Sequence, residues 1–250
     1  MAVTYTVFMF IIGLFLGSFY NVVGLRVPKK ETFVTGRSYC PKCKKTLSWY
    51  ELIPVLSFLF LRGKCRKCGA KIAWIYPAIE LMTGVMFAFS YYKIGFSLEL
   101  LLALSFVSML MIIFVSDISY MLIPDKVLLF FLPIFIILRI LLPFDPWWSP
   151  IVGAIASFLL IALIIIISKG GMGAGDMKLF GLLGIVLGLK HVFLAFFLAC
   201  LIGTIIGGIQ MLRKRVKKGE PIPFGPSIVL AALITYFYGD LLISFYMQLF

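Results

Sequence analysis

Residues 98–117 read LELLLALSFVSMLMIIFVSD, an apolar run that ends in an aspartate. The run Leu98–Ser116 has about the length, roughly 20 residues, that an α-helix needs to cross the hydrocarbon of a bilayer. An ionised carboxylate such as Asp117 costs about 2.5–3.5 kcal/mol near hydrocarbon even on the most lenient insertion scale, so such residues are usually functional. The stretch therefore predicts a membrane helix with a functional carboxylate at its end.

The composition of the whole chain also indicates a membrane protein. Of its 250 residues, 62% are hydrophobic and 13% are charged, whereas soluble domains carry about 25% charged residues. We expect an all-α polytopic membrane protein with about eight spans, at residues 5–25, 76–94, 98–116, 126–142, 150–168, 177–190, 191–212 and 227–248. The sixth span is short, so seven spans with a re-entrant segment fit nearly as well. The first span has no basic residue before it and is too long for a signal peptide.

A polar insert and the placement of charge give the organisation and the orientation. We expect a first transmembrane helix, a small cytosolic domain and a larger membrane domain, at residues 1–25, 26–75 and 76–250. With the N-terminus outside, 20 of the 23 Lys and Arg residues fall in cytosolic segments, as the positive-inside rule requires. This placement accounts for the net charge of +13 without a nucleic-acid partner. A basic cytosolic face attracts anionic lipid.

A second carboxylate, Asp176, ends the segment GMGAGD at residues 171–176 and also follows an apolar run. In this orientation Asp117 and Asp176 both lie at cytosolic helix ends, where water and substrate can reach them. Two carboxylates at matching depth predict a pair that activates water, one ionised and the other protonated, although Asp117 alone also fits a solvated helix end. Glycines before Asp176 let a partner chain approach the backbone closely. They are Gly170, Gly171, Gly173 and Gly175.

Other polar residues near the predicted helix ends have structural interpretations. Asp125 follows Pro124 and begins an apolar run, as expected of a helix N-cap. Gly17 and Asn21 share one face of the first helix, so Asn21 points into the bundle. A buried hydrogen bond between Asn21 and Glu80 is the structural account of these two residues.

The cytosolic insert carries two paired cysteine motifs, CPKC at 40–43 and CRKC at 65–68. Their spacing is close to that of four-thiolate zinc sites, and basic neighbours favour the thiolates. Two disulfides are the alternative, which a reducing cytosol disfavours. We expect a structural Zn²⁺ that stabilises a domain with almost no core, bound by Cys40, Cys43, Cys65 and Cys68. Cys200 lies in an apolar span and is interpreted as a packing residue.

Motifs of one family run almost from end to end of the chain. They are GSFYNVVGLRVP at 17–28, RSYCPKC at 37–43, WYELIPVLSF at 49–58, YPAIE at 76–80, DISYMLIPD at 117–125, GMGAGDMKL at 171–179 and PFGP at 223–226. In these stretches the chain resembles the type IV prepilin peptidases, which are bifunctional leader peptidases and N-methyltransferases among the GxGD membrane aspartic proteases. One departure is Ser119, where many members carry a second acid. The resemblance assigns catalysis to the first acid, Asp117, so the main assignment is unaffected.

The resemblance implies an enzyme that cleaves the short basic leader from type IV prepilins or pseudopilins at the cytosolic face of the cell membrane. Asp117 and Asp176 would be its catalytic residues, within a peptidase domain at 76–250. The new N-terminal residue, usually Phe, would then be methylated with S-adenosylmethionine. This second activity rests on the resemblance alone, because the sequence has no glycine-rich nucleotide-binding fingerprint. Its candidate residues are Asn21, Arg26 and Glu80.

A basic leader would be repelled by the basic cytosolic face, so we expect an acidic residue to bind it. Glu51 and Glu80 are the candidates for that contact.

Two other functional classes stay open at this point. A transporter would use membrane acids to carry a cation, but these acids lie at one face and no inverted repeat is present. A structural assembly platform would explain the cysteines and leave the aspartate pair without a role. Loss of prepilin cleavage in Asp176→Asn would exclude both.

Overall fold

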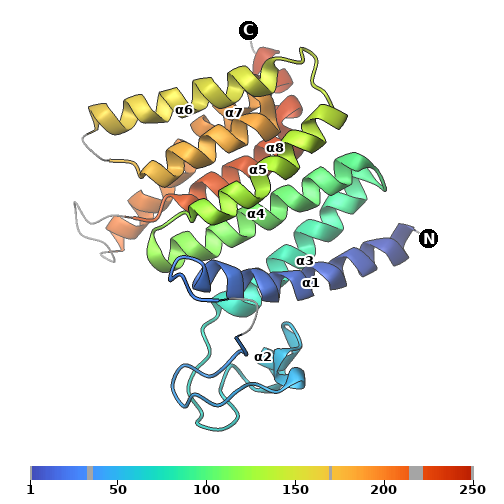
Figure 1. Cartoon of the computed structure of the whole chain (residues 1–250), viewed down its shortest axis with the longest axis vertical. Coiled ribbons are helices and arrows are strands. Elements are labelled where there is room, and N and C mark those ends of the chain that lie inside the picture. The colour runs from blue at the N-terminus through green and yellow to red at the C-terminus, as the bar shows by residue number, and fades with distance from the viewer. Residues whose placement is uncertain (1, 33–35, 169–170, 214–221, 249–250) are drawn as a thin grey trace. The chain divides into compact units, whose positions relative to one another are not determined.

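The computed structural model describes residues 2–32, 36–168, 171–213 and 222–248, and within these ranges it contains helices but no strand (Figure 1). The elements are α1 (Ala2–Arg26), the short 3-10 helix η1 (Trp49–Leu52), α2 (Leu56–Phe60), α3 (Ile75–Ile94), α4 (Leu98–Tyr120), α5 (Asp125–Leu141), α6 (Ser149–Ile167), α7 (Ala174–Leu212) and α8 (Gly225–Met247). Among the described residues, α1, α4, α6, α7 and α8 contain stretches long and apolar enough to cross a membrane. The predicted fold class, an all-helical polytopic membrane protein, is confirmed.

Helix α7 contains both the sixth and the seventh predicted spans. A straight helix of its 39 residues would be about 58 Å long, roughly twice the hydrocarbon thickness. However, Gly188 has a positive φ of 75°, and the rings of Phe180 and Phe196 lie 5.7 Å apart between centroids. A straight helix would separate these two residues by about 24 Å along its axis. The chain therefore folds back at Gly188 into two antiparallel segments, close to the predicted break between 190 and 191.

The reversal at Gly188 is held by the start of α6. The backbone N–H of Leu189 donates to Ser149 Oγ at 3.0 Å, and a Cβ at Gly188 would lie 2.9 Å from the same oxygen. Glycine is required here both for the positive φ and for the close approach.

The chain divides into two compact units, residues 1–115 and 116–250, with the boundary inside α4. In the first unit, α1 packs against α3 through small residues. A Cβ at Gly13 would lie 2.7 Å from the Cα of Gly84, and one at Gly17 would lie 2.8 Å from the Cα of Glu80. Such close helix contact is typical of small residues in membranes. The predicted division at residues 25 and 75 stays a prediction.

In the second unit, α7 packs against α5, α6 and α8. A side chain at Gly184 would collide with the backbone of Ala154 on α6, and Ser157 of α6 donates to the carbonyl of Phe180 at 2.8 Å. On the other flank, Arg139 of α5 donates to the carbonyl of Val186. The first segment of α7 is thereby fixed along its length, and Asp176 lies in its first turn.

Helix α5 begins differently from the prediction for Asp125. Pro124, with extended backbone, occupies the N-cap, and Asp125 is the first helical residue. Its carboxylate instead accepts two hydrogen bonds from Lys178 Nζ, both 2.8 Å long. The prediction that Asp125 caps the helix is therefore wrong, because a cation from α7 reaches its side chain.

Candidate active site and metal centre

Asp117 lies in the last turn of α4 and is buried. Its Oδ2 accepts a hydrogen bond of 2.7 Å from the backbone N–H of Gly225, the first residue of α8. The approach is so close that a Cβ at Gly225 would lie 2.6–2.7 Å from Oδ2, Cβ and Cγ of Asp117. First-turn amides have no intrahelical acceptor and carry partial positive charge, so the start of α8 stabilises this carboxylate.

Gly225 is a site residue that sequence reasoning missed. The available signal was the motif FGP at 224–226, a glycine between an aromatic residue and a proline at the start of an apolar run. Proline favours a helix start, but the local sequence does not indicate that the backbone N–H of Gly225 would bind the carboxylate of Asp117.

Asp176 lies in the first turn of α7 and is also buried. Its Oδ2 accepts a hydrogen bond of 3.0 Å from the N–H of Gly173, the N-cap residue. Gly175 lies within the helix, and a Cβ there would be 3.0 Å from Ile123 Cβ. Gly171 precedes the helix, and its N–H donates to Ser168 Oγ at 3.0 Å. Gly170 lies outside the described residues.

Asp117 and Asp176 are both buried, and the segment that follows Asp117 meets the first turn of α7, where a Cβ at Gly175 would lie 3.0 Å from Ile123 Cβ. Two buried carboxylates that repel each other are stabilised by sharing one proton. In each carboxylate, Oδ2 is held by one backbone amide, which leaves Oδ1 for water or substrate. This arrangement suits acid–base chemistry, in which one carboxylate accepts a proton and the other donates one.

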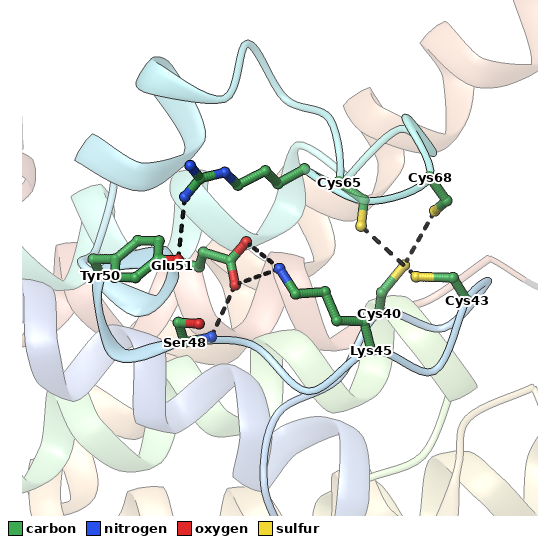
Figure 2. A network of polar contacts seen from close by, with 9 residues as sticks. Cys40, Cys43, Lys45, Ser48, Tyr50, Glu51, Cys65 and Cys68 are labelled. Carbon is green, nitrogen blue, oxygen red and sulfur yellow. Dashed lines mark hydrogen bonds and ion pairs between the residues drawn. The ribbon is translucent and has the colours of Figure 1, made fainter.

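The four predicted zinc ligands form one cluster in the insert (Figure 2). Their sulfur atoms all lie within 4.8 Å of one another; Cys40 and Cys68 are 3.8 Å apart and Cys43 and Cys65 are 3.9 Å apart. A tetrahedral Zn²⁺ with bonds of about 2.3 Å places its sulfurs about 3.8 Å apart. The cysteines are free thiols, so the disulfide alternative is wrong, and the cluster has the size that zinc requires.

The thiols of this cluster do not ionise equally on their own. The backbone N–H of Cys43 lowers the pKa of Cys40 to about 6, and that of Cys68 lowers the pKa of Cys65. The backbone N–H of Ala70 lowers the pKa of Cys68, but partial desolvation and hydrogen bonds with the other three thiols together outweigh it and raise this pKa to about 11. Four thiolates together therefore need a cation between them.

Glu51 ties the first cysteine motif to helix η1 (Figure 2). Its buried carboxylate accepts hydrogen bonds from Lys45 Nζ at 3.0 and 3.2 Å and from the N–H of Ser48 at 2.8 Å. The Ser48 bond is the largest effect that holds the pKa of Glu51 below its usual range, and Lys45 adds to it. Glu51 is thus engaged within the insert, which leaves it poorly placed to receive a basic leader.

Glu80 and Asn21 each bond backbone rather than each other. The Glu80 carboxylate accepts the N–H of Val55 at 2.7 Å, and Val55 has a positive φ of 59°, which is strained for a β-branched residue. Asn21 Nδ2 donates to the carbonyl of Tyr76 at 3.1 Å. Among the described residues, Asn21 Oδ1 is buried without a hydrogen-bond partner. The expected Asn21–Glu80 hydrogen bond is replaced by these contacts.

Arg26, the third candidate for methyl transfer, ends α1 and holds the start of the insert. Its guanidinium donates to the carbonyls of Thr32 at 3.3 Å, Gly36 at 2.9 Å and Arg37 at 3.2 Å. These bonds fix the path of the chain as it leaves the membrane helix.

We expect Cys40→Ser in the full-length protein to lose its zinc. Purified wild type should contain about one zinc per chain and the variant close to none, because a four-thiolate site needs all four ligands. The insert should then be cleaved faster than wild type in limited proteolysis. Cys200→Ser is the matched control and should keep the metal. Wild-type protein without zinc by elemental analysis would contradict the assignment.

The chain is similar to known peptidases along most of its length. Its residues 11–94 match the Bacterial Peptidase A24 N-terminal domain, and residues 104–208 match the Type IV leader peptidase family. The prepilin leader peptidase/N-methyltransferase of Bacillus subtilis (strain 168) is 46% identical over 241 residues, which cover 96% of this chain and 97% of that protein. The protein of the same name from Neisseria gonorrhoeae is 32% identical over 259 residues, covering 92% and 89%. That from Myxococcus xanthus (strain DK1622) is 34% identical over 213 residues, covering 83% and 64%.

No solved structure matches the chain. Its fold defines a helical integral membrane protein with two buried carboxylates. The chain belongs to the Type IV leader peptidase family.

Proposed function

We propose that this protein removes the leader from type IV prepilins or pseudopilins and methylates the new N-terminus. The proposal is supported above all by the 46% identity to a prepilin leader peptidase/N-methyltransferase, in a chain whose Asp117 and Asp176 are both buried and each bound by one backbone amide. The predicted transporter and platform alternatives have no comparable support.

In the peptidase reaction, Asp117 and Asp176 act on one water molecule. The ionised carboxylate removes a proton as the water oxygen attacks the carbonyl carbon of the leader junction. The protonated carboxylate donates its proton to the amide nitrogen as the C–N bond breaks. The amides of Gly225 and Gly173 hold the two Oδ2 atoms during these transfers.

The glycines before α7 make room for an extended substrate. Peptide bonds within a helix are protected by their own hydrogen bonds, so the leader junction has to be extended where it meets the carboxylates. Gly171 and Gly173 precede the helical residues of α7, and Gly175 lies in its first turn, where amides have no intrahelical acceptor. Gly175 makes room for Ile123, and the missing side chains at Gly171 and Gly173 let a substrate backbone lie beside Asp176.

Methylation involves residues of the first unit. S-adenosylmethionine supplies an electrophilic methyl group. The unpartnered Oδ1 of Asn21 and the carboxylate of Glu80 are acceptors, which suit the α-ammonium group of the cleaved pilin. Glu80 would remove the proton that the amine must lose before it reacts, and Arg26 would position the insert. The zinc has a structural role.

The protein works in the cell membrane with its N-terminus outside and its active site facing the cytosol. The reason is the concentration of basic residues in the predicted cytosolic segments. Anionic lipid is a partner of that face, and nucleic acid is not.

A peptide assay tests both activities in one sample. Purified protein in proteoliposomes is incubated with a prepilin and S-adenosylmethionine, and the products are weighed by mass spectrometry. The expected product lacks the leader and carries one additional methyl group. Glu80→Gln should cleave normally and methylate about 10²-fold more slowly, the effect of losing a general base. An intact prepilin after incubation with wild type would refute the proposal, and normal methylation by Glu80→Gln would refute the role of Glu80.

A further inference from the structure

An apolar groove in the second unit lies between α5, α6 and the first segment of α7. It has a volume of about 510 Å³, within the range of roughly 300–1,000 Å³ that is usual for ligand sites. Its lining is apolar except at one end. Its three walls include Leu129 and Leu132 of α5, Ile155 and Phe158 of α6, and Gly181 and Ile185 of α7.

The polar end of the groove is the ion pair between Asp125 and Lys178. Lys178 follows Asp176 by two positions on α7. Asp125 lies two positions after Ile123, and Ile123 packs against Gly175, the residue before Asp176. The polar end of the groove therefore lies at the same end of α7 as Asp176, and the apolar part continues along α5, α6 and α7.

We propose that this groove binds the apolar helix of the prepilin, with its basic leader at Asp125. This inference rests on the proposed function. The two acids first expected to receive the leader are engaged elsewhere, Glu51 by Lys45 and Glu80 by Val55. The Asp125 side chain is 57% exposed and its partner 46% exposed. Exposed ion pairs contribute little stability, so a basic group of the leader can replace Lys178 with little loss.

The shape and charge of the groove favour a peptide helix over a lipid chain. Gly181 has no side chain, which lets the backbone of another helix come close, as small residues do between membrane helices. A Cβ placed at Gly181 would be in ordinary van der Waals contact with Phe158, at 3.5 Å, and with the carbonyl oxygen of Ala154, at 3.9 Å, so a larger side chain here would project into the groove. A basic leader can replace Lys178 at the Asp125 carboxylate, whereas a lipid phosphate would have to bind Lys178 next to that carboxylate, which repels it.

Photo-crosslinking locates the substrate helix directly. The photoreactive residue p-benzoylphenylalanine is placed at Leu129 or Phe130 of full-length Asp176→Asn protein, which retains uncleaved prepilin. Both positions are 65% exposed and adjacent on α5, but only Leu129 lines the groove. The expected yield of prepilin adduct is several-fold higher at position 129, because only that side chain lines the groove. Equal yields, or a lipid adduct in place of a prepilin adduct at 129, would overturn the proposal.

Filling the groove gives a kinetic test in the active enzyme. Gly181→Leu should raise KM for the prepilin about tenfold and leave kcat near the wild-type value, because a pocket that loses apolar contact changes binding by roughly this factor. Gly208→Leu, at a position with open space around it, is the control and should match wild type. If wild type cleaves the prepilin but Gly181→Leu has an unchanged KM, the groove assignment fails. If wild type does not cleave it, the proposed function fails.

Discussion

Asp117→Asn and Asp176→Asn are each expected to lower the rate of leader cleavage by about 10²–10⁴-fold, the usual contribution of a general acid or base. Asparagine keeps an oxygen that can accept the N–H of Gly225 or Gly173, so the helix ends should stay in place. Each variant should therefore insert into the membrane as wild type does. Cleavage of a prepilin in proteoliposomes, followed by mass spectrometry, measures the loss.

Two controls separate chemistry from folding in these variants. A peptide without its leader should still be methylated by both, because Asn21 and Glu80 belong to the other unit. Asp125→Asn should retain much of kcat at saturating prepilin, because Asp125 is proposed to bind the leader and pairs with Lys178, not with the dyad. Full cleavage by Asp117→Asn would exclude it as a catalytic residue.

Gly225→Ala is expected to reduce cleavage about 10²-fold, since displacing a catalytic group by about 1 Å has an effect of this size. The added methyl group would lie 2.6–2.7 Å from three atoms of the Asp117 side chain. Either the carboxylate or the first turn of α8 has to move, and the 2.7 Å hydrogen bond between them is lost or lengthened. The measurement is the cleavage rate at saturating prepilin, with methylation of a leaderless peptide as the check on folding.

Gly208→Ala is the matched control for this substitution. It also adds one methyl group to a glycine of the second unit, but no atom lies within 4 Å of the added position. It should cleave at the wild-type rate. Equal rates for Gly225→Ala and Gly208→Ala would show that the contact with Asp117 has no catalytic role.

The membrane helices were predictable because their signal is local. Each predicted span corresponds to a helical segment, and the fold-back in α7 lies at Gly188, close to the predicted boundary. Its exact position was not predictable, because the run 177–212 is apolar throughout and the positive φ of Gly188 is set by contact with Ser149. The cysteine cluster was predictable for a similar reason, since the two short motifs each fix a pair of sulfurs.

The partners of the polar residues were not predictable, because they come from distant parts of the chain. Asp117 was identified by the cost of a charge near hydrocarbon, but the amide that holds it lies 108 residues away. Asp125 has the sequence context of a helix cap, and only the packing of α7 brings Lys178 to it. Glu80 likewise bonds Val55 in the insert and not the nearby Asn21.

The helical hairpin formed by α7 sets the spacing between the two carboxylates of the candidate active site. Its outgoing arm carries Asp176 in its first turn, and its returning arm brings Gly203 against Phe224, where a Cβ at Gly203 would lie 2.7 Å from the ring. Phe224 directly precedes Gly225, whose amide holds Asp117. The spacing of the two carboxylates therefore depends on the lengths of both arms, which meet at Gly188, a position distant from both carboxylates. One residue added to one arm would shift its end by about 1.5 Å and rotate it by about 100°, so the two arms have to keep matched lengths even though the reversal itself touches no reacting atom.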